Sequence, residues 1–171
     1  CAAGILGEIG PFPDVSIAEW EKVFQVNVLG TVRCIQAAYP LMKKNNGGRV
    51  VLFSGAGQGA LRSFAPYASS KGAIWRLTES LGAELAAENI YINAIAPGAV
   101  KTKLLHDIMK AGPDKVGSEY FKQVEEKMAS GGISPLKAVE LSLFLLSPEA
   151  KGLPHSGAEG GLCGRHQCRL G

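Results

Sequence analysis

Apolar residues along the chain follow two patterns, and together these predict an α/β fold. Residues 50–53 form a continuous apolar run of strand length, and residues 90–96 are predicted to form a second buried strand. Around these runs, apolar residues recur at helical spacing. Alternating strands and helices imply right-handed crossovers and a parallel sheet. The pattern therefore predicts a partial doubly wound parallel sheet, Rossmann-like, with helices on both faces.

Three helices are predicted from their apolar stripes and their end signals. Ser16 and Glu19 form a capping box at the start of the first helix, which ends at residues 45–48 and can carry a kink. The second helix starts after Pro66, and the third starts at Ser134 and Pro135. The residues predicted to face the core are Phe24, Val28, Val32, Ile35, Tyr39 and Met42 in the first helix, Ile74, Leu77, Leu81 and Leu85 in the second, and Leu136, Val139, Leu143 and Leu146 in the third.

The composition is that of one globular domain without a strong charge bias. The chain has 171 residues, 46% of them hydrophobic, and its net charge of +3 comes from scattered Lys and Arg residues. This distribution suggests neither nucleic-acid nor membrane binding, and no apolar run reaches the length of a membrane span. The cysteines show no disulfide framework, so we expect a reducing cytoplasm. Cys163, His166 and Cys168 do not match a metal-site spacing, so no metal is expected.

The most informative polar residues are Tyr67, Lys71 and Ser54. On a helix that starts after Pro66, Tyr67 and Lys71 are four residues apart and share one face, while Ser54 follows the strand at residues 50–53. A phenol titrates near pH ~10 and is a poor acid or base at neutrality unless its anion is stabilised. Lys71 can supply that stabilisation, and the Ser54 hydroxyl can hold a carbonyl or alcohol oxygen while Tyr67 transfers the proton. The trio predicts an alcohol/carbonyl redox site.

Two other patterns in the chain imitate functional motifs. Tyr39 and Lys43 are also four residues apart, but Val26, thirteen residues before Tyr39, has no hydroxyl. We predict that this pair is a surface lysine beside a packed tyrosine. Residues 55–60 satisfy a G-x-G-x-x-A phosphate-loop pattern, but further residues separate them from the next helix. We expect these glycines to let the loop bend tightly against substrate.

Five motifs occur in register along the chain. They are Ala2-Ala3-Gly4, residues 26–31 around Asn27, residues 48–54 ending in Ser54, the pair Tyr67 and Lys71, and residues 92–102 with the Pro97-Gly98 turn. In this order and at these intervals, residues 1–151 resemble the catalytic half of the short-chain dehydrogenase/reductase family. The resemblance implies a nicotinamide cofactor, NAD or NADP without distinction, and an alcohol or ketone as the small-molecule substrate.

By this resemblance, the catalytic residues are Asn27, Ser54, Tyr67 and Lys71. Tyr67 is the general acid/base, Lys71 lowers its pKa and binds the nicotinamide ribose, and Ser54 orients the substrate oxygen. The backbone of Asn27, at a helix kink, helps to hold a water of the proton relay. An Asn that only ends or bends a helix would be the preferred interpretation if Asn27 stood alone. The cofactor-binding residues that the resemblance implies are Cys1, Ala3, Gly4, Tyr67, Lys71, Pro97, Gly98, Val100 and Thr102.

The chain departs from the family pattern at both ends. The family usually has Asn-Asn-Ala-Gly where this chain has Cys1-Ala2-Ala3-Gly4, which keeps the close backbone approach at Gly4. The glycine fingerprint of the adenosine-binding half does not precede it, so we expect a fragment truncated at the N-terminus. Residues 152–171 lack an apolar run long enough for the family's last strand. We expect them to form a disordered tail unrelated to the family.

Alternatives remain open for one segment and for the function. Residues 102–128 are partly helical with an apolar side, and they are either the substrate lid of the family or a solvent-facing connector. The leading function is an NAD(P)-dependent oxidoreductase whose isolated fragment is weak or inactive. The alternative is a non-catalytic remnant that acts as an oligomerisation or interaction module. The resemblance also implies a homodimer or homotetramer, formed through the two long helices, when the protein is complete.

Overall fold

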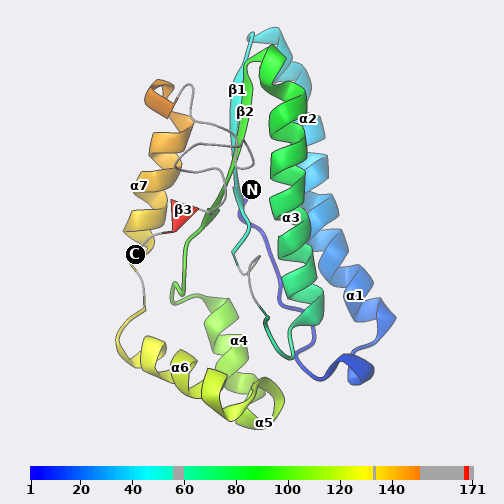
Figure 1. The fold of residues 1–171 in the computed structure, drawn as a ribbon, viewed down its shortest axis with the longest axis vertical. Helices are drawn as coiled ribbons and strands as arrows, with labels where there is room; N and C mark the ends of the chain where they lie inside the picture. Colours follow the sequence, from blue (N-terminus) through cyan, green and yellow to red (C-terminus); the bar gives the residue numbers. More distant parts are fainter. Residues whose placement is uncertain (56–59, 133, 151–167, 170–171) are drawn as a thin grey trace.

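The described part of the chain contains a three-stranded parallel sheet. The computed structural model describes residues 1–55, 60–132, 134–150 and 168–169. β1 (Gly48–Phe53) pairs with β2 (Ile90–Ala96) from Gly48 opposite Ile90 to Phe53 opposite Ile95. β3 (Cys168–Arg169) pairs with the end of β2. The parallel sheet predicted from the two apolar runs is confirmed (Figure 1).

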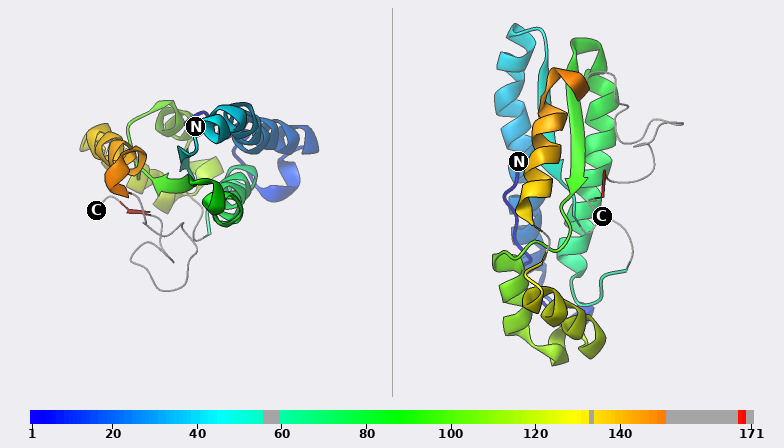
Figure 2. Two further views of the ribbon diagram at one scale, coloured as in Figure 1. Left: turned by 90° about the horizontal axis from the view of Figure 1, so that it is seen from above. Right: turned by 90° about the vertical axis from the view of Figure 1, so that its left-hand side faces the viewer.

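Helices cover both faces of this sheet, as predicted (Figure 1, Figure 2). α2 (Gly30–Lys44) and α3 (Ala65–Leu85) pack on one face, and α7 (Pro135–Leu146) packs on the other. Neighbouring residues of a strand point to opposite faces, so β1 and β2 contribute to two separate cores. The first core contains Ile35, Leu52, Ile74, Leu85, Ile90, Ile92 and Ala94, and the second contains Val51, Ile95, Ala138 and Leu145.

A π-helical turn interrupts the first predicted helix and supplies its kink. α1 (Ile17–Phe24), η2 (Gln25–Leu29) and α2 follow one another directly, with η2 in the π conformation. The stripe predicted at Phe24, Val28 and Val32 is one residue off, since these side chains are only half-buried. Two of the four buried positions carry polar residues, so the search for an apolar stripe selected the apolar residues next to them instead. The buried positions are Val23, Asn27, Thr31 and Ile35.

The predicted start of this helix is confirmed. The Ser16 hydroxyl accepts a hydrogen bond from the Glu19 backbone N–H at 3.3 Å, which satisfies one of the unpaired N–H groups of the first turn. The Glu19 carboxylate pairs with Lys22 Nζ at 3.0 Å. Three short 3₁₀ helices occur elsewhere in the described residues, at η1 (Phe12–Asp14), η3 (Ala86–Glu88) and η4 (Pro148–Ala150).

Three helices gather beyond the carboxyl ends of the strands (Figure 1). They are α4 (Lys103–Ala111), α5 (Pro113–Val116) and α6 (Ser118–Ala129), and the chain turns at Gly112, between α4 and α5, as the sequence predicts. Val116 and Val124 are buried against Phe64 in one apolar cluster. The apolar side of the segment therefore packs on the body of the fold, while many of its other residues are exposed.

The prediction for the core-facing side of α7 is wrong. Ala138 and Leu145 face the sheet, whereas Leu136 and Leu143 are 66% and 62% exposed. Val139 and Leu146 are exposed as well. The helix carries two apolar stripes, and periodicity alone does not tell which of them packs inward. Its start is as predicted, because the Ser134 hydroxyl accepts a hydrogen bond from the Leu136 N–H at 3.3 Å.

The remaining predictions concern segments that the structure describes only in part. Of residues 152–171, only β3 is described, and these two residues pair with β2 where a disordered tail was expected. Strand pairing is a backbone interaction, so it needs no apolar run. The rest of that predicted tail lies outside the described residues. No helix in the described ranges is long and apolar enough to cross a membrane.

Candidate active site

The predicted site residues gather where β1 and β2 end. Ser54 directly follows β1, and Pro97 directly follows β2. The chain enters beside β1, since the amino nitrogen of Cys1 donates a hydrogen bond to the Val51 carbonyl at 2.9 Å. The carboxyl ends of parallel strands are the usual place for ligands in open α/β sheets. The fold therefore brings the start of the chain and both strand ends to one edge.

Tyr67 and Lys71 lie in the first turns of α3, as predicted. The helix begins at Ala65 with Pro66 in its first turn. The Lys71 side chain is buried, its Nζ lies 5.7 Å from the centre of the Tyr67 ring, and it donates a hydrogen bond to the Phe53 carbonyl at 2.8 Å. Lys71 thus joins α3 to the end of β1.

Gly55, which follows Ser54, lies beside the Tyr67 hydroxyl. A Cβ built on Gly55, which has φ +60°, would lie 3.4 Å from the Tyr67 hydroxyl oxygen. Ser54 is fully buried, and its N–H donates to the Ile95 carbonyl at 3.1 Å. Among the described residues no hydrogen bond involves the Tyr67 hydroxyl, so this hydroxyl is available to a ligand. Residues 56–59 of the glycine pattern lie outside the described ranges, and the pattern does not lead directly into α3.

Gly4 and Asn27 complete the group around Lys71. A Cβ built on Gly4 would lie 3.5 Å from both Asn27 Oδ1 and Lys71 Nζ. Asn27 is buried in the π-helical turn and bonds both backbone groups of Ile5: its Oδ1 accepts from the N–H at 2.8 Å, and its Nδ2 donates to the carbonyl at 3.0 Å. The missing side chain at Gly4 leaves room beside Lys71 for a molecule to approach the backbone.

The other predicted cofactor residues occupy two exposed segments at the same edge. Cys1 and Ala3 are exposed. Pro97, Gly98, Val100 and Thr102 form the loop between β2 and α4, in which the Val100 N–H donates to the Gly98 carbonyl at 3.1 Å. No hydrogen bond in the described part of the chain joins this loop to Tyr67 or Lys71.

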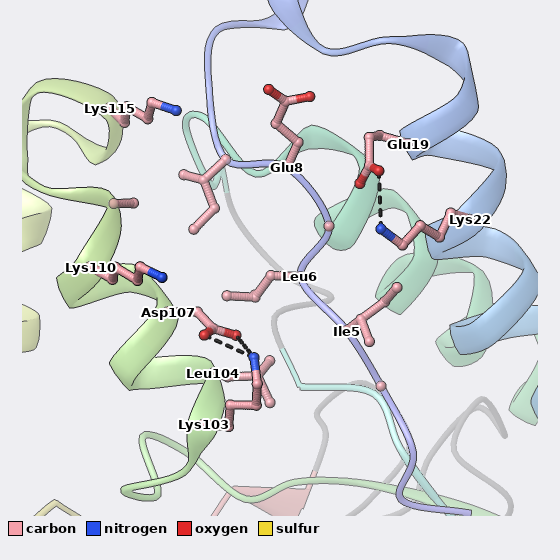
Figure 3. A pocket seen from close by; sticks show the side chains of 14 residues that line it. Ile5, Leu6, Glu8, Glu19, Lys22, Lys103, Leu104, Asp107, Lys110 and Lys115 are labelled. Carbon is pink, nitrogen blue, oxygen red and sulfur yellow. Dashed lines mark hydrogen bonds and ion pairs between the residues drawn. The ribbon is translucent and has the colours of Figure 1, made fainter.

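A cavity of about 680 Å³ reaches this group from the outside (Figure 3). It lies between residues 4–9 and α4, and Gly4 is part of its wall. The ion pair of Lys103 with Asp107, at 2.6 Å, lies on the α4 side. Gly4 thus borders both the cavity and the Lys71 amine. The described residues contain no cluster of three or more His, Cys, Asp or Glu that could hold a metal, and Cys163 and His166 lie outside them.

The electrostatics of the tyrosine differ from the expectation. Burial, and to a smaller degree the neighbouring phenol of Tyr120, raises the pKa of Tyr67 to about 12. Burial also lowers the pKa of Lys71. The amine donates its hydrogen bond to the Phe53 carbonyl, so desolvation outweighs the expected lowering of the phenol pKa by Lys71. At neutral pH, Tyr67 is a protonated phenol that can donate a proton.

Raising the pH above 10 should destabilise the folded chain, because Tyr67 resists ionisation when buried. The phenol ionises near pH 10 in the unfolded chain and near 12 in the folded chain, so between these values the unfolded state binds fewer protons and the free energy of unfolding falls. The full shift corresponds to about 3 kcal/mol. Denaturant unfolding at increasing pH should show that Tyr67→Phe loses less stability than the parent. The lowered pKa of Lys71 makes the free energy of unfolding rise with pH below 10.5. The parent and the Tyr67→Phe variant both contain Lys71, so this contribution cancels in the comparison. An equal loss in both chains would assign the effect to other groups.

Sequence reasoning missed two residues next to the site. Ser70 is fully buried and accepts a hydrogen bond from Asn27 Nδ2 at 2.9 Å; its position directly before Lys71 was the available signal. Tyr120 of α6 packs its ring edge-on against Phe64, with ring centres 5.6 Å apart. Tyr120 belongs to the apolar side of residues 102–128, and this pattern alone gives no sign that its phenol lies near Tyr67.

The second tyrosine–lysine pair is a structural contact, as predicted. The Tyr39 hydroxyl donates to both carboxylate oxygens of Glu88 at 2.9 Å, and Lys43 Nζ lies 3.3 Å from that hydroxyl and 3.5 Å from Glu88. The cluster ties α2 to η3, just before β2 begins. It therefore lies at the amino end of the sheet, opposite to Tyr67.

Comparison with known proteins gives consistent matches. The family model for short chain dehydrogenases matches residues 1–112. "Dehydrogenase/reductase SDR family member 4" of Rattus norvegicus is 36% identical over 142 residues, which cover 82% of this chain and 49% of the rat protein. Among solved structures, NAD+-bound xylitol dehydrogenase has a TM-score of 0.73 at 31% identity, covering 86% of this chain and 61% of the other. Actinorhodin polyketide ketoreductase with NADPH has the same TM-score at 27% identity, covering 86% and 59%.

The family model includes the segments that carry Gly4, Asn27, Ser54, Tyr67 and Lys71. The chain spans about half the length of the curated relatives that it matches. The chain belongs to the short-chain dehydrogenase/reductase family.

Proposed function

We propose that this chain carries the proton-transfer site of an NAD(P)-dependent oxidoreductase that interconverts an alcohol and a carbonyl compound. Tyr67 would be the general acid/base, assisted by Lys71, Ser54 and Asn27. The observation that carries the proposal is the juxtaposition at the sheet edge. The Tyr67 hydroxyl, which forms no hydrogen bond with the described residues, lies beside Gly55, and the Lys71 amine lies beside Gly4, so each functional group adjoins a residue without a side chain.

The bound nicotinamide would supply the hydride to the carbonyl carbon or accept it from the alcohol. In the reducing direction, the carbonyl oxygen gains negative charge as the carbon is reduced, and Tyr67 donates its proton to that oxygen. The phenolate left behind is then reprotonated from solvent. The buried hydroxyl of Ser54, next to Gly55, is suited to hold the same oxygen. Burial raises the pKa of Tyr67 to about 12, so Tyr67 is protonated at neutral pH, and proton transfer would require that Lys71 and the bound cofactor stabilise the phenolate.

The residues around Gly4 are suited to the sugar part of such a cofactor. Lys71 Nζ lies close to Gly4, which lines the cavity; Cys1 and Ala3 are exposed, and Gly4 has no side chain that would block close approach to its backbone. The loop with Pro97, Gly98, Val100 and Thr102 would border the nicotinamide by analogy with the family. The structural relatives include an NAD+-bound and an NADPH-bound enzyme, so neither cofactor is preferred for this chain.

A second candidate function is an interaction module without catalysis. It is favoured by the exposed apolar stripe on α7, where Leu136 and Leu143 are more than half exposed. The complete protein would form a homodimer or homotetramer by analogy with the family. The two candidates differ in whether a nicotinamide cofactor binds.

Cofactor titration followed by turnover on a panel of aldehydes and ketones tests the proposal. The longest gene product that contains this chain should bind NADH or NADPH and consume it with a carbonyl substrate, whereas the 171-residue chain alone should be weak or inactive. Binding is followed by nicotinamide fluorescence, and turnover by loss of the reduced cofactor's absorbance. Failure of the longer product to bind either cofactor would favour the interaction module.

A further inference from the structure

A chain of buried hydrogen bonds joins three segments behind the catalytic residues. Asn27 and Ser70 are 1% and 0% exposed. Asn27 Nδ2 donates to the Ser70 hydroxyl at 2.9 Å, and that hydroxyl donates to the Tyr67 carbonyl at 2.7 Å. On its other side, Asn27 holds both backbone groups of Ile5. The chain of bonds therefore runs from the segment beside Gly4, through the π-helical turn, to the first turns of α3.

Every N–H and O–H donor of the Asn27 and Ser70 side chains has an acceptor in this arrangement. The Asn27 amide has two N–H donors, which go to Ile5 and Ser70, while its oxygen accepts the Ile5 N–H. These partners fix the orientation of the amide group, because a flipped amide would bring donor to donor at the Ile5 N–H. The Ser70 hydroxyl both accepts and donates, which an alanine cannot do. Loss of this hydroxyl would leave a buried Asn27 N–H without its partner.

We propose that Ser70 is a positioning residue, which acts through Asn27 to hold Tyr67 and Lys71 in register with Gly4 and Ile5. The proposal rests on the function proposed above, because it gives Tyr67 and Lys71 their roles. Ser70 precedes Lys71 and follows Tyr67 by three residues, so a shift of this turn moves both functional groups at once. Reaction rates depend steeply on such placement, and a displacement of about 1 Å can cost about 10²-fold.

Ser70→Ala should therefore lower kcat by about 10- to 100-fold while the KM for the carbonyl substrate changes much less. Exchange of the Ile5 amide hydrogen should also become faster, by roughly tenfold or more, because its acceptor Asn27 loses its anchor on α3. The kinetics are measured on the longest gene product, and amide exchange is measured on the same protein. The exchange rate does not require turnover, so it reports on positioning by itself.

Thr78→Val is the matched control. Thr78 lies on the same helix, is also 0% exposed, and donates its hydroxyl to the Ile74 carbonyl at 2.8 Å within α3. It has no bond to Asn27. Thr78→Val should leave kcat and the Ile5 exchange rate close to those of the parent. Denaturant unfolding of both variants shows whether their losses of stability are comparable.

The outcomes separate the positioning role from general damage and from the proposed function. A parental kcat in Ser70→Ala, or an equal fall in Thr78→Val, overturns the positioning role. A slow, parental Ile5 exchange in Ser70→Ala overturns it as well. If even the parent shows no turnover with any substrate, the proposed function fails, and the Ile5 exchange alone then decides whether Ser70 holds Asn27 in place.

Discussion

Tyr67→Phe should reduce turnover by about 10²- to 10⁴-fold, the range typical for loss of a general acid. Phenylalanine keeps the ring, which packs against the cluster around Phe64, and removes only the hydroxyl. Among the described residues this hydroxyl takes part in no hydrogen bond, so its removal leaves none of their polar groups without a partner. Cofactor affinity should fall much less than turnover, because Lys71 and Gly4 are unchanged and only one of the expected cofactor contacts is lost. Steady-state kinetics and cofactor titration of the longest gene product measure both quantities.

Tyr39→Phe is the control for this experiment, since Tyr39 belongs to the other tyrosine–lysine pair. Its hydroxyl bonds Glu88 at the opposite end of the sheet, so its loss should cost about 1 kcal/mol of stability and leave kcat unchanged. If Tyr67→Phe retained full activity, the proton would have to come from another group, and the proposed role of Tyr67 would be wrong.

Gly7→Ala should cost roughly 2 to 5 kcal/mol of folding free energy, through backbone strain and overpacking together. Gly7 has φ +71°, which is strained for any residue with a Cβ. A Cβ at this position would also overlap Val23 Cγ2, and Val23 is fully buried. Val23 lies in α1, two residues before the π-helical turn, and its burial leaves little room for it to shift. The midpoint of denaturant unfolding measures the loss.

Gly10→Ala provides the matched comparison for Gly7. Gly10 is in the same segment, but its φ is not positive and a Cβ there would have no heavy atom within 4 Å. The Gly10 N–H keeps its bond to the Ser63 carbonyl at 3.0 Å. This substitution should change stability by less than about 1 kcal/mol. Similar unfolding midpoints for the two variants would contradict the steric argument.

The parts of the fold that follow from hydrophobic pattern were predictable. The two strand runs predicted the parallel pair β1 and β2, because a strand covered on both faces is apolar at most positions. The helix start at Pro66 followed from proline chemistry, and it placed Tyr67 and Lys71 on one helix face. Each of these signals depends only on residues that are close together in the sequence, so it can be read without knowledge of the tertiary structure.

The features that were missed depend on contacts between distant residues. The buried face at Asn27 and Thr31 is polar, and its burial is possible only because Ile5 and Ser70 supply hydrogen bonds from elsewhere in the chain. Which of the two apolar stripes of α7 faces the core depends on the sheet against which the helix packs. Ala138 packs against that sheet, and Leu136 faces away from it. The direction of the Tyr67 pKa shift likewise depends on the burial of the phenol and on the Phe53 carbonyl as the hydrogen-bond acceptor of Lys71.

The π-helical turn at Gln25–Leu29 fixes how many residues the chain must have between α1 and α2. In a regular α-helix, which turns by about 100° per residue, two positions as far apart as Val23 and Ile35 would point about 120° away from each other. Both side chains are buried, because the wider π-helical turn between them absorbs one extra residue. The extra residue of the π-helical turn thus keeps the buried positions of α1 and α2 on one side of the helix. We expect insertions and deletions to be tolerated in the surface loops long before they are tolerated in α1 or α2.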